Sequence, residues 1–195
     1  MKPENPTFII KTDRLFHDSP AFFYKFAGLT CMDMKRIVSI IIAAAFFLTS
    51  VNAQTNLKKI YDEEADPLAQ IESALKLAGN EGKFVISQVG GNWCRWCLMF
   101  ADFIEKDTEL SEFIDDNFVF IHSNYNPRER ADEKTLEMLR RLGNPSRFGF
   151  PVFVVMDSTG KVLHIQDSSY LEEGNGYNRD KVIRFFRNWT PEAVR

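Results

Sequence analysis

Cysteine and excess positive charge are the two things this chain has little of. Its 195 residues include only three cysteines, Cys31, Cys94 and Cys97. A small exported domain stapled by disulfides needs a larger set, so a disulfide-rich scaffold is excluded. Lys and Arg number 24 against 27 Asp and Glu, which gives a net charge of −3. That balance gives the chain no electrostatic reason to bind nucleic acid.

The chain also lacks a comfortable membrane span. Its apolar run, Ile37–Leu48, is shorter than the roughly 20 residues that a bilayer requires. The run follows Lys35-Arg36 and precedes the small residues of Val51-Asn52-Ala53, which is the layout of a cleaved secretory signal peptide. We therefore expect an exported protein, periplasmic or extracellular, without stable membrane insertion after cleavage. No cysteine follows the run, so a lipid-anchored lipoprotein is not expected.

These signals divide the chain into four parts. Residues 1–33 precede the signal and show no clear period, so we interpret them as an over-extended gene start or a short disordered extension. Residues 34–53 are the expected signal peptide, which places the mature N-terminus at Gln54 and removes Cys31. Residues 54–65 are expected to be a linker, and 66–195 have the length of one domain with one core. We expect this domain to be a monomer.

The two remaining cysteines lie in Trp93-Cys94-Arg95-Trp96-Cys97, directly after an apolar run. A dithiol at this spacing can close into a disulfide and open again. If Cys94 begins a helix, unpaired backbone N–H groups and the helix dipole favour its thiolate, which is the nucleophile. The positive charge of Arg95 acts in the same direction. The motif therefore predicts a redox centre that needs no cofactor and no metal.

Apolar periodicity and turn residues predict an α/β order of elements. Asp66-Pro67 should start a helix that Gly79 ends, and Thr108 is a candidate cap for a second stretch of the central helix. In the helix over 131–142, Leu136, Leu139 and Leu142 are expected on one face. The predicted helices cover residues 67–78, 94–106, 109–114, 131–142 and 180–189, and the strands cover 84–89, 118–122, 151–156 and 161–166, with a polar loop over 168–178. This order implies a mixed sheet with helices on both faces.

At this point residues 66–190 resemble the thioredoxin superfamily. The resemblance rests on the strand leading into the two cysteines, on Gly149-Phe150-Pro151-Val152, and on the hairpin and helix that follow. Trp-Cys-x-Trp-Cys is similar to the motif of exported thioredoxin-like proteins. The resemblance implies a thioredoxin-like fold, with a central mixed β-sheet flanked by helices on both faces. It further implies that Cys94 is an exposed attacking thiol, that Cys97 is a buried resolving thiol, and that Pro151 follows a cis bond beside them.

One position departs from that family. The strand before the motif usually holds a buried acid six residues before the first cysteine, and here that residue is Gln88. An amide cannot take a proton at neutral pH. The group that deprotonates Cys97 is therefore open, with His122 and water as candidates. A histidine on a strand is also commonly a hydrogen-bonded structural residue.

The leading interpretation is a thiol–disulfide oxidoreductase that acts by dithiol/disulfide exchange on protein substrates. Cys94 and Cys97 are its expected catalytic residues. Trp93, Arg95, Trp96, Phe150 and Pro151 are the expected substrate-binding residues, although the two tryptophans can equally be packing residues. Its partners are protein disulfides or dithiols and a redox protein that recycles the pair. Reductase, oxidase and isomerase directions remain open.

Two alternatives come from other classes. The first is a binding protein on the same fold with an inert disulfide, since fold alone does not fix function. The second is a zinc module formed by Cys94, Cys97, His122 and His164. The spacing disfavours zinc, because structural sites usually cluster their histidines a few residues apart.

Overall fold

The computed structural model describes residues 57–194. The predicted extension 1–33, the signal peptide 34–53 and the mature start at Gln54 lie outside these residues. Within residues 57–194, none of the helices is long and apolar enough to cross a membrane.

The centre of the domain is a four-stranded sheet in the order β2-β1-β3-β4. Its strands are β1 (Phe84–Gly90), β2 (Phe118–Asn124), β3 (Val152–Met156) and β4 (Val162–Asp167). Strand β2 runs parallel to β1, whereas β3 is antiparallel to both β1 and β4. The mixed sheet expected from the sequence is therefore confirmed, and β1 occupies an interior position in it.

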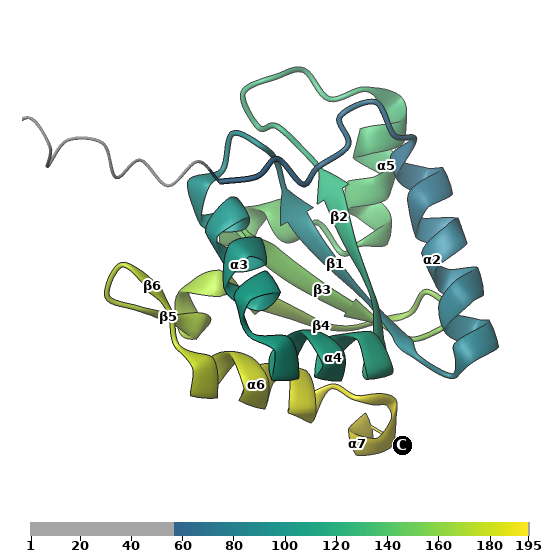
Figure 1. Cartoon of the computed structure of the whole chain (residues 1–195). Coiled ribbons are helices and arrows are strands. Elements are labelled where there is room, and N and C mark those ends of the chain that lie inside the picture. The colour runs from purple at the N-terminus through teal and green to yellow at the C-terminus, as the bar shows by residue number, and fades with distance from the viewer. Residues whose placement is uncertain (1–56, 195) are drawn as a thin grey trace, which may run out of the picture. The chain divides into compact units, whose positions relative to one another are not determined.

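Helices cover both faces of this sheet (Figure 1). Helices α2 (Pro67–Glu81) and α5 (Glu133–Arg141) pack on one face, and α3 (Arg95–Lys106), α4 (Thr108–Asn117) and α6 (Arg179–Asn188) on the other. Strand alternation produces the two cores. Val85 and Val89 face α2 and α5, while Ile86 belongs to the core under α3, α4 and α6. The predicted α/β architecture with helices on both faces is confirmed.

The helix ends follow capping chemistry, with two corrections. The Asp66 side chain accepts hydrogen bonds from the backbone N–H groups of Leu68 and Ala69, as expected for an N-cap. However, α2 continues to Glu81 and ends at Gly82, which has the left-handed φ of 69°. Gly79 instead lies inside the helix. The cap of α4 is Asp107 rather than Thr108, because the Asp107 carboxylate accepts from Leu110 N–H.

Two further expectations are wrong in detail. Leu136 is 49 % exposed, whereas Met138, Leu139 and Leu142 are buried. Helix α5 begins only at Glu133 and turns this second set toward the sheet. The predicted loop 168–178 contains a short helix and a small hairpin, and short helices also occur at two other unpredicted places. These elements are η2 (Ser168–Leu171), β5 (Glu172–Glu173), β6 (Gly176–Tyr177), η1 (Pro145–Phe148) and α7 (Pro191–Val194).

Candidate active site

The two cysteines lie where β1 gives way to α3. Cys94 is the N-cap of α3, and the helix begins at Arg95. Cys94 and Cys97 form a disulfide, with their Cα atoms 5.3 Å apart. The Cys94 Sγ also accepts a hydrogen bond from the Cys97 backbone N–H at 3.2 Å. The first turn of the helix therefore directs the Cys97 backbone N–H at the Cys94 sulfur. This hydrogen bond favours negative charge on that sulfur.

The disulfide is more enclosed than expected. Cys97 is fully buried, and Cys94 retains only 6 % of its exposure, so the expected exposure of Cys94 is not observed. Apolar side chains from three parts of the chain surround the sulfurs and reduce their contact with water. They are Leu57, Ile60, Tyr61, Trp93, Trp96, Leu98 and Phe150. Cys94 is still the more exposed residue of the pair.

Trp93 and Phe150 form one wall of the site. Their rings meet edge to face with centroids 5.3 Å apart, and the Trp93 indole N–H donates to the Tyr125 carbonyl oxygen at 3.1 Å. The Phe150–Pro151 bond is cis, as predicted. Phe150 also packs against the cluster that contains both cysteines. The structure therefore brings residues 93 and 150 together at the dithiol.

Trp96 and Arg95, the two residues between the cysteines, differ in their environment: Trp96 is partly buried and Arg95 is exposed. Trp96 packs edge to face against Tyr177 with centroids 5.6 Å apart, and its carbonyl oxygen accepts from the Tyr177 hydroxyl at 3.0 Å. Trp96 is thus partly a packing residue that joins α3 to the hairpin after β4. Arg95 is exposed on the first turn of α3, directly after Cys94.

The segment before α2 closes the other side of the site. In Figure 1 it crosses the carboxyl end of β1 on its way into α2. Asn92 fastens it: the Asn92 Oδ1 accepts from the N–H groups of Ile60 and Tyr61, both at 3.1 Å, and its Nδ2 donates to the Tyr61 carbonyl at 2.8 Å. Sequence reasoning missed Tyr61, which is only 5 % exposed. The available signal was one aromatic residue beside Leu57 and Ile60 in a charged stretch.

A buried polar network lies directly beneath the disulfide. The Gln88 Nε2 donates to the Tyr61 hydroxyl oxygen at 2.8 Å and to the Cys97 carbonyl oxygen at 3.1 Å. His122, paired with Gln88 across the strands, places its ring edge-on to Tyr61 with centroids 5.4 Å apart. Burial lowers the pKa of His122 to about 4 and raises the pKa of the Tyr61 hydroxyl well above its usual value. Both side chains are therefore neutral at pH 7, and His122 is a weak proton acceptor.

The two histidines of the zinc alternative lie on opposite edge strands. His122 belongs to β2, while His164 belongs to β4 and stacks on Trp189 with centroids 4.4 Å apart. Only His122 approaches the cysteines, through Tyr61. In the part of the chain that the structure describes, no group of three or more His, Cys, Asp or Glu side chains could hold a metal ion.

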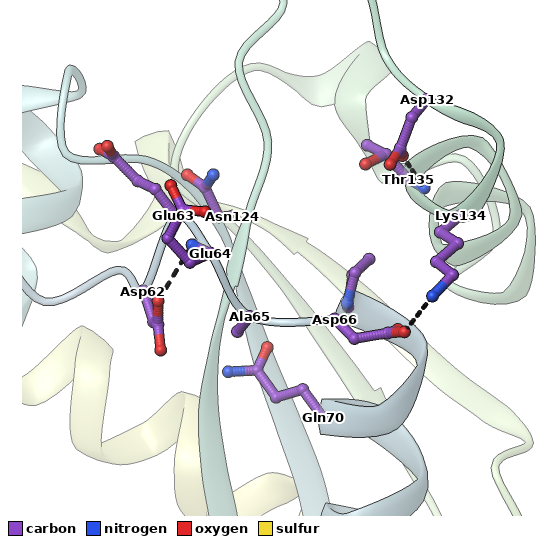
Figure 2. A pocket seen from close by; sticks show the side chains of 11 residues that line it. Asp62, Glu63, Glu64, Ala65, Asp66, Gln70, Asn124, Asp132, Lys134 and Thr135 are labelled. Carbon is purple, nitrogen blue, oxygen red and sulfur yellow. Dashed lines mark hydrogen bonds and ion pairs between the residues drawn. The ribbon is translucent and has the colours of Figure 1, made fainter.

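A polar pocket lies between the segment before α2 and the start of α5 (Figure 2). Two of its acidic side chains engage the start of α5: Asp66 pairs with Lys134, and Asp132 accepts from the Thr135 N–H at 2.8 Å. Neither cysteine lines this pocket. The pocket is thus a polar helix junction that is separate from the disulfide at the end of β1.

Comparison with known proteins identifies one matching family. The family model described as "Thioredox_DsbH: Protein of unknown function, DUF255" matches residues 51–190, which is most of the chain. A search of curated proteins finds no match.

Several solved structures are similar to this chain. A disulphide isomerase from Xylella fastidiosa Temecula1 is 25% identical with a TM-score of 0.58, covering 68% of this chain and 97% of that chain. A DsbH oxidoreductase is 20% identical with a TM-score of 0.43, over 69% of this chain and 89% of that one. The oxidised C-terminal domain of Neisseria meningitidis DsbD is 20% identical with a TM-score of 0.45, over 67% and 98%. The similarity to the first of these confirms the thioredoxin-like fold.

Proposed function

The chain belongs to the thioredoxin-like Thioredox_DsbH (DUF255) family, and on that premise we propose that it is a thiol–disulfide oxidoreductase of protein substrates. The observation that carries the proposal is the Cys94–Cys97 disulfide at the first turn of α3. A loop this short restrains the unfolded chain little, so stabilisation alone is a weak reason for the bond. Reversible thiol–disulfide exchange, in contrast, requires two cysteines that are close enough to form and break this bond.

Cys94 is the attacking residue in this proposal. Once the pair is reduced, the N–H that bonds the Cys94 Sγ in the disulfide state remains available to its thiolate. The thiolate attacks a substrate disulfide, forms a mixed disulfide and releases one substrate thiol. Cys97 then attacks the Cys94 sulfur, the second substrate thiol leaves, and the Cys94–Cys97 bond forms again. Oxidation of a substrate dithiol is the reverse sequence.

The substrate lies, in this proposal, against the wall formed by Trp93 and Phe150. Phe150 lies just before the start of β3 and packs against the cluster that contains both cysteines, so in this proposal the backbone at Phe150 receives the substrate. An extended substrate segment pairs with that backbone as an added strand. Arg95 and Trp96 border the opposite rim and contact the flanking residues of the substrate.

The site acts in an oxidising compartment outside the cytoplasm. The signal-like residues 34–53 support export, and a working dithiol there requires a redox protein that resets it after each turnover. The cysteine pair is the only chemical group that the reaction needs, so no cofactor takes part.

Reduction of insulin by dithiothreitol tests the proposal. The protein should accelerate the precipitation of the insulin B chain, and Cys94→Ser should abolish the acceleration. One observation favours the inert-disulfide alternative, namely that Cys94 is only 6 % exposed. If the wild-type protein fails to accelerate the reaction while its disulfide resists reduction, the alternative replaces the proposal.

A further inference from the structure

The Tyr61 hydroxyl and the Cys97 sulfur approach the same point above Gly90. A Cβ placed on Gly90 would lie 2.4 Å from the Cys97 Sγ and 2.8 Å from the Tyr61 Oη. Both distances are far below any ordinary contact with a Cβ atom. Only glycine leaves the space that these two polar atoms occupy at the end of β1.

Gln88 fixes the direction in which the Tyr61 hydroxyl can donate. The Cys97 carbonyl can only accept a hydrogen bond, so the Gln88 group that faces it must be the amide NH₂. The same NH₂ donates its other hydrogen to the Tyr61 oxygen. The hydroxyl proton of Tyr61 is therefore directed elsewhere, and within residues 57–194 no hydrogen bond engages it.

This orientation of the Gln88 amide leaves one of its buried polar atoms without a hydrogen bond. Gln88 is fully buried, and its Oε1 has no hydrogen-bond partner among the described residues. A buried polar atom without a partner destabilises the fold, and an apolar side chain of similar size would avoid the penalty. The amide at this position therefore does more than fill space: its NH₂ group holds the Tyr61 hydroxyl.

We propose that the Tyr61 hydroxyl, oriented by Gln88, donates a hydrogen bond to the Cys97 sulfur when the disulfide opens, and thereby stabilises the resolving thiolate. Tyr61 is the donor to the reacting sulfur, and Gln88 and Asn92 are positioning residues. The inference rests on the proposed function, because only an exchanging disulfide uses a Cys97 thiolate.

The step that gains from this contact is the resolution of the mixed disulfide. Cys97 loses its proton to solvent, its sulfur bonds to the Cys94 sulfur, and the substrate sulfur leaves with the electron pair of the broken bond and takes up a proton. Burial without a donor would disfavour the Cys97 thiolate. A hydroxyl donor offsets part of that penalty without adding a charge to the site.

The other titratable groups around the site do not replace this donor. From β2, His122 faces Tyr61 and is neutral because burial lowers its pKa to about 4. From β6, the Tyr177 hydroxyl is already committed to the Trp96 carbonyl oxygen. Glu63 accepts from the Asn92 Nδ2 at 2.9 Å at the surface, and Arg95 is exposed. From α3 itself, Cys94 presents its sulfur to the Cys97 N–H.

The pKa of Cys97 in the full chain tests the proposal directly. In a Cys94→Ser background, the pH dependence of the Cys97 ¹³Cβ chemical shift resolves this thiol from Cys31. Tyr61→Phe keeps the ring and removes the hydroxyl, and it should raise the Cys97 pKa by about one pH unit, a tenfold loss of thiolate. Asn92→Ala, which releases the segment but keeps Tyr61, should raise it in the same direction.

Tyr125→Phe is the matched control. Tyr125 packs against Phe150 with ring centroids 5.8 Å apart, on the α2–α5 side of the site, and loss of its hydroxyl should leave the Cys97 pKa unchanged. Equal Cys97 pKa values in Tyr61→Phe, Asn92→Ala and the control would overturn the inference. The readout is independent of turnover: a shifted pKa without insulin reduction would preserve the contact and reject the proposed function.

Discussion

The Cys94 sulfur accepts a hydrogen bond from the backbone N–H of Cys97, three residues later, at 3.2 Å. The contact is the capping interaction of α3 made by sulfur instead of oxygen. It makes the two cysteines chemically unequal, because in the disulfide state the sulfur that caps the helix receives a backbone N–H and the sulfur inside the helix does not. The difference between two otherwise similar thiols follows from their positions in one turn.

Single-cysteine variants should reveal this inequality. In a Cys31→Ser background, Cys97→Ser should accumulate mixed disulfides with substrate proteins, because Cys94 attacks and nothing resolves the product. Cys94→Ser should accumulate essentially none, because Cys97 is fully buried. Non-reducing electrophoresis followed by mass spectrometry of the adducts measures both. Adducts in equal amounts on the two variants would contradict the assignment.

Phe150 should govern which substrates reach Cys94. Phe150→Ala removes a ring that contacts Trp93 and Tyr125, so compact disulfide proteins should be reduced about tenfold better relative to an unfolded one. Reaction of Cys94 with a small disulfide reagent should change little. The loss of packing should also lower the free energy of unfolding by about 1–3 kcal/mol, since the ring is half-buried.

Phe148→Ala is the control for this prediction. Phe148 lies two residues earlier, is more exposed, and stacks under the Arg147 guanidinium. The same truncation there should leave substrate preference unchanged. Identical shifts in preference for both variants would show that Phe150 has no specific role at the site.

Two glycines should respond oppositely to a methyl group. Gly90→Ala forces a Cβ to 2.4 Å from the Cys97 Sγ, so it should destabilise the oxidised protein by about 3 kcal/mol or prevent closure of the disulfide. Gly79→Ala, inside α2 with its nearest neighbour 3.9 Å away, should stabilise it by about 0.5–1 kcal/mol. Urea unfolding of the oxidised proteins measures both, and a neutral Gly90→Ala would refute the close approach.

Burial of His122 should make stability depend on pH. Its pKa is lowered from 6.5 to about 4 in the folded protein, whereas the unfolded chain keeps the ordinary value. Above pH 6.5 both states are neutral. As pH falls toward 4, the unfolded state binds a proton that the folded state does not, so stability decreases by no more than about 3 kcal/mol. Below pH 4 this contribution levels off.

His122→Phe isolates that contribution from the carboxylates. The ring contacts with Tyr61 and Phe120 can be retained, but the proton-binding site is lost. The difference in unfolding free energy between wild type and His122→Phe should therefore change between pH 7.5 and pH 4.5 in favour of the variant. A difference that stays constant over this range would mean that His122 is not buried in its neutral form.

The sequence predicted those features of the fold and the site that depend on residues close together in the chain. The CxxC spacing and the strand before it are local features, and they predicted the cysteine pair, whereas the cis bond before Pro151 was implied by the resemblance to the thioredoxin superfamily. The N-cap of α2 could also be predicted, because the Asp66 carboxylate accepts hydrogen bonds from N–H groups only two and three residues away. Leu136 shows the limit even for local patterns, because the phase of a short helix depends on where its first turn is capped.

The position of the segment before α2, which covers one side of the site, could not be predicted from the sequence. Asn92 and Tyr61 are 31 residues apart. No local pattern in the charged segment before α2 predicts that Tyr61 packs beside Cys97. Tyr61 then packs in the same buried cluster as Cys94. Gln88 departs from the family pattern in the sequence itself, but its partner Tyr61 comes from a segment 27 residues away.

The reduction potential of the Cys94–Cys97 pair tests the central claim most directly. The protein is equilibrated in glutathione buffers of defined ratio, the free thiols are alkylated, and the oxidised fraction is measured by mass spectrometry. A working pair should titrate reversibly as a two-electron couple between about −270 and −120 mV, the range of thiol–disulfide oxidoreductases. A potential below about −300 mV, typical of structural disulfides, would contradict the account.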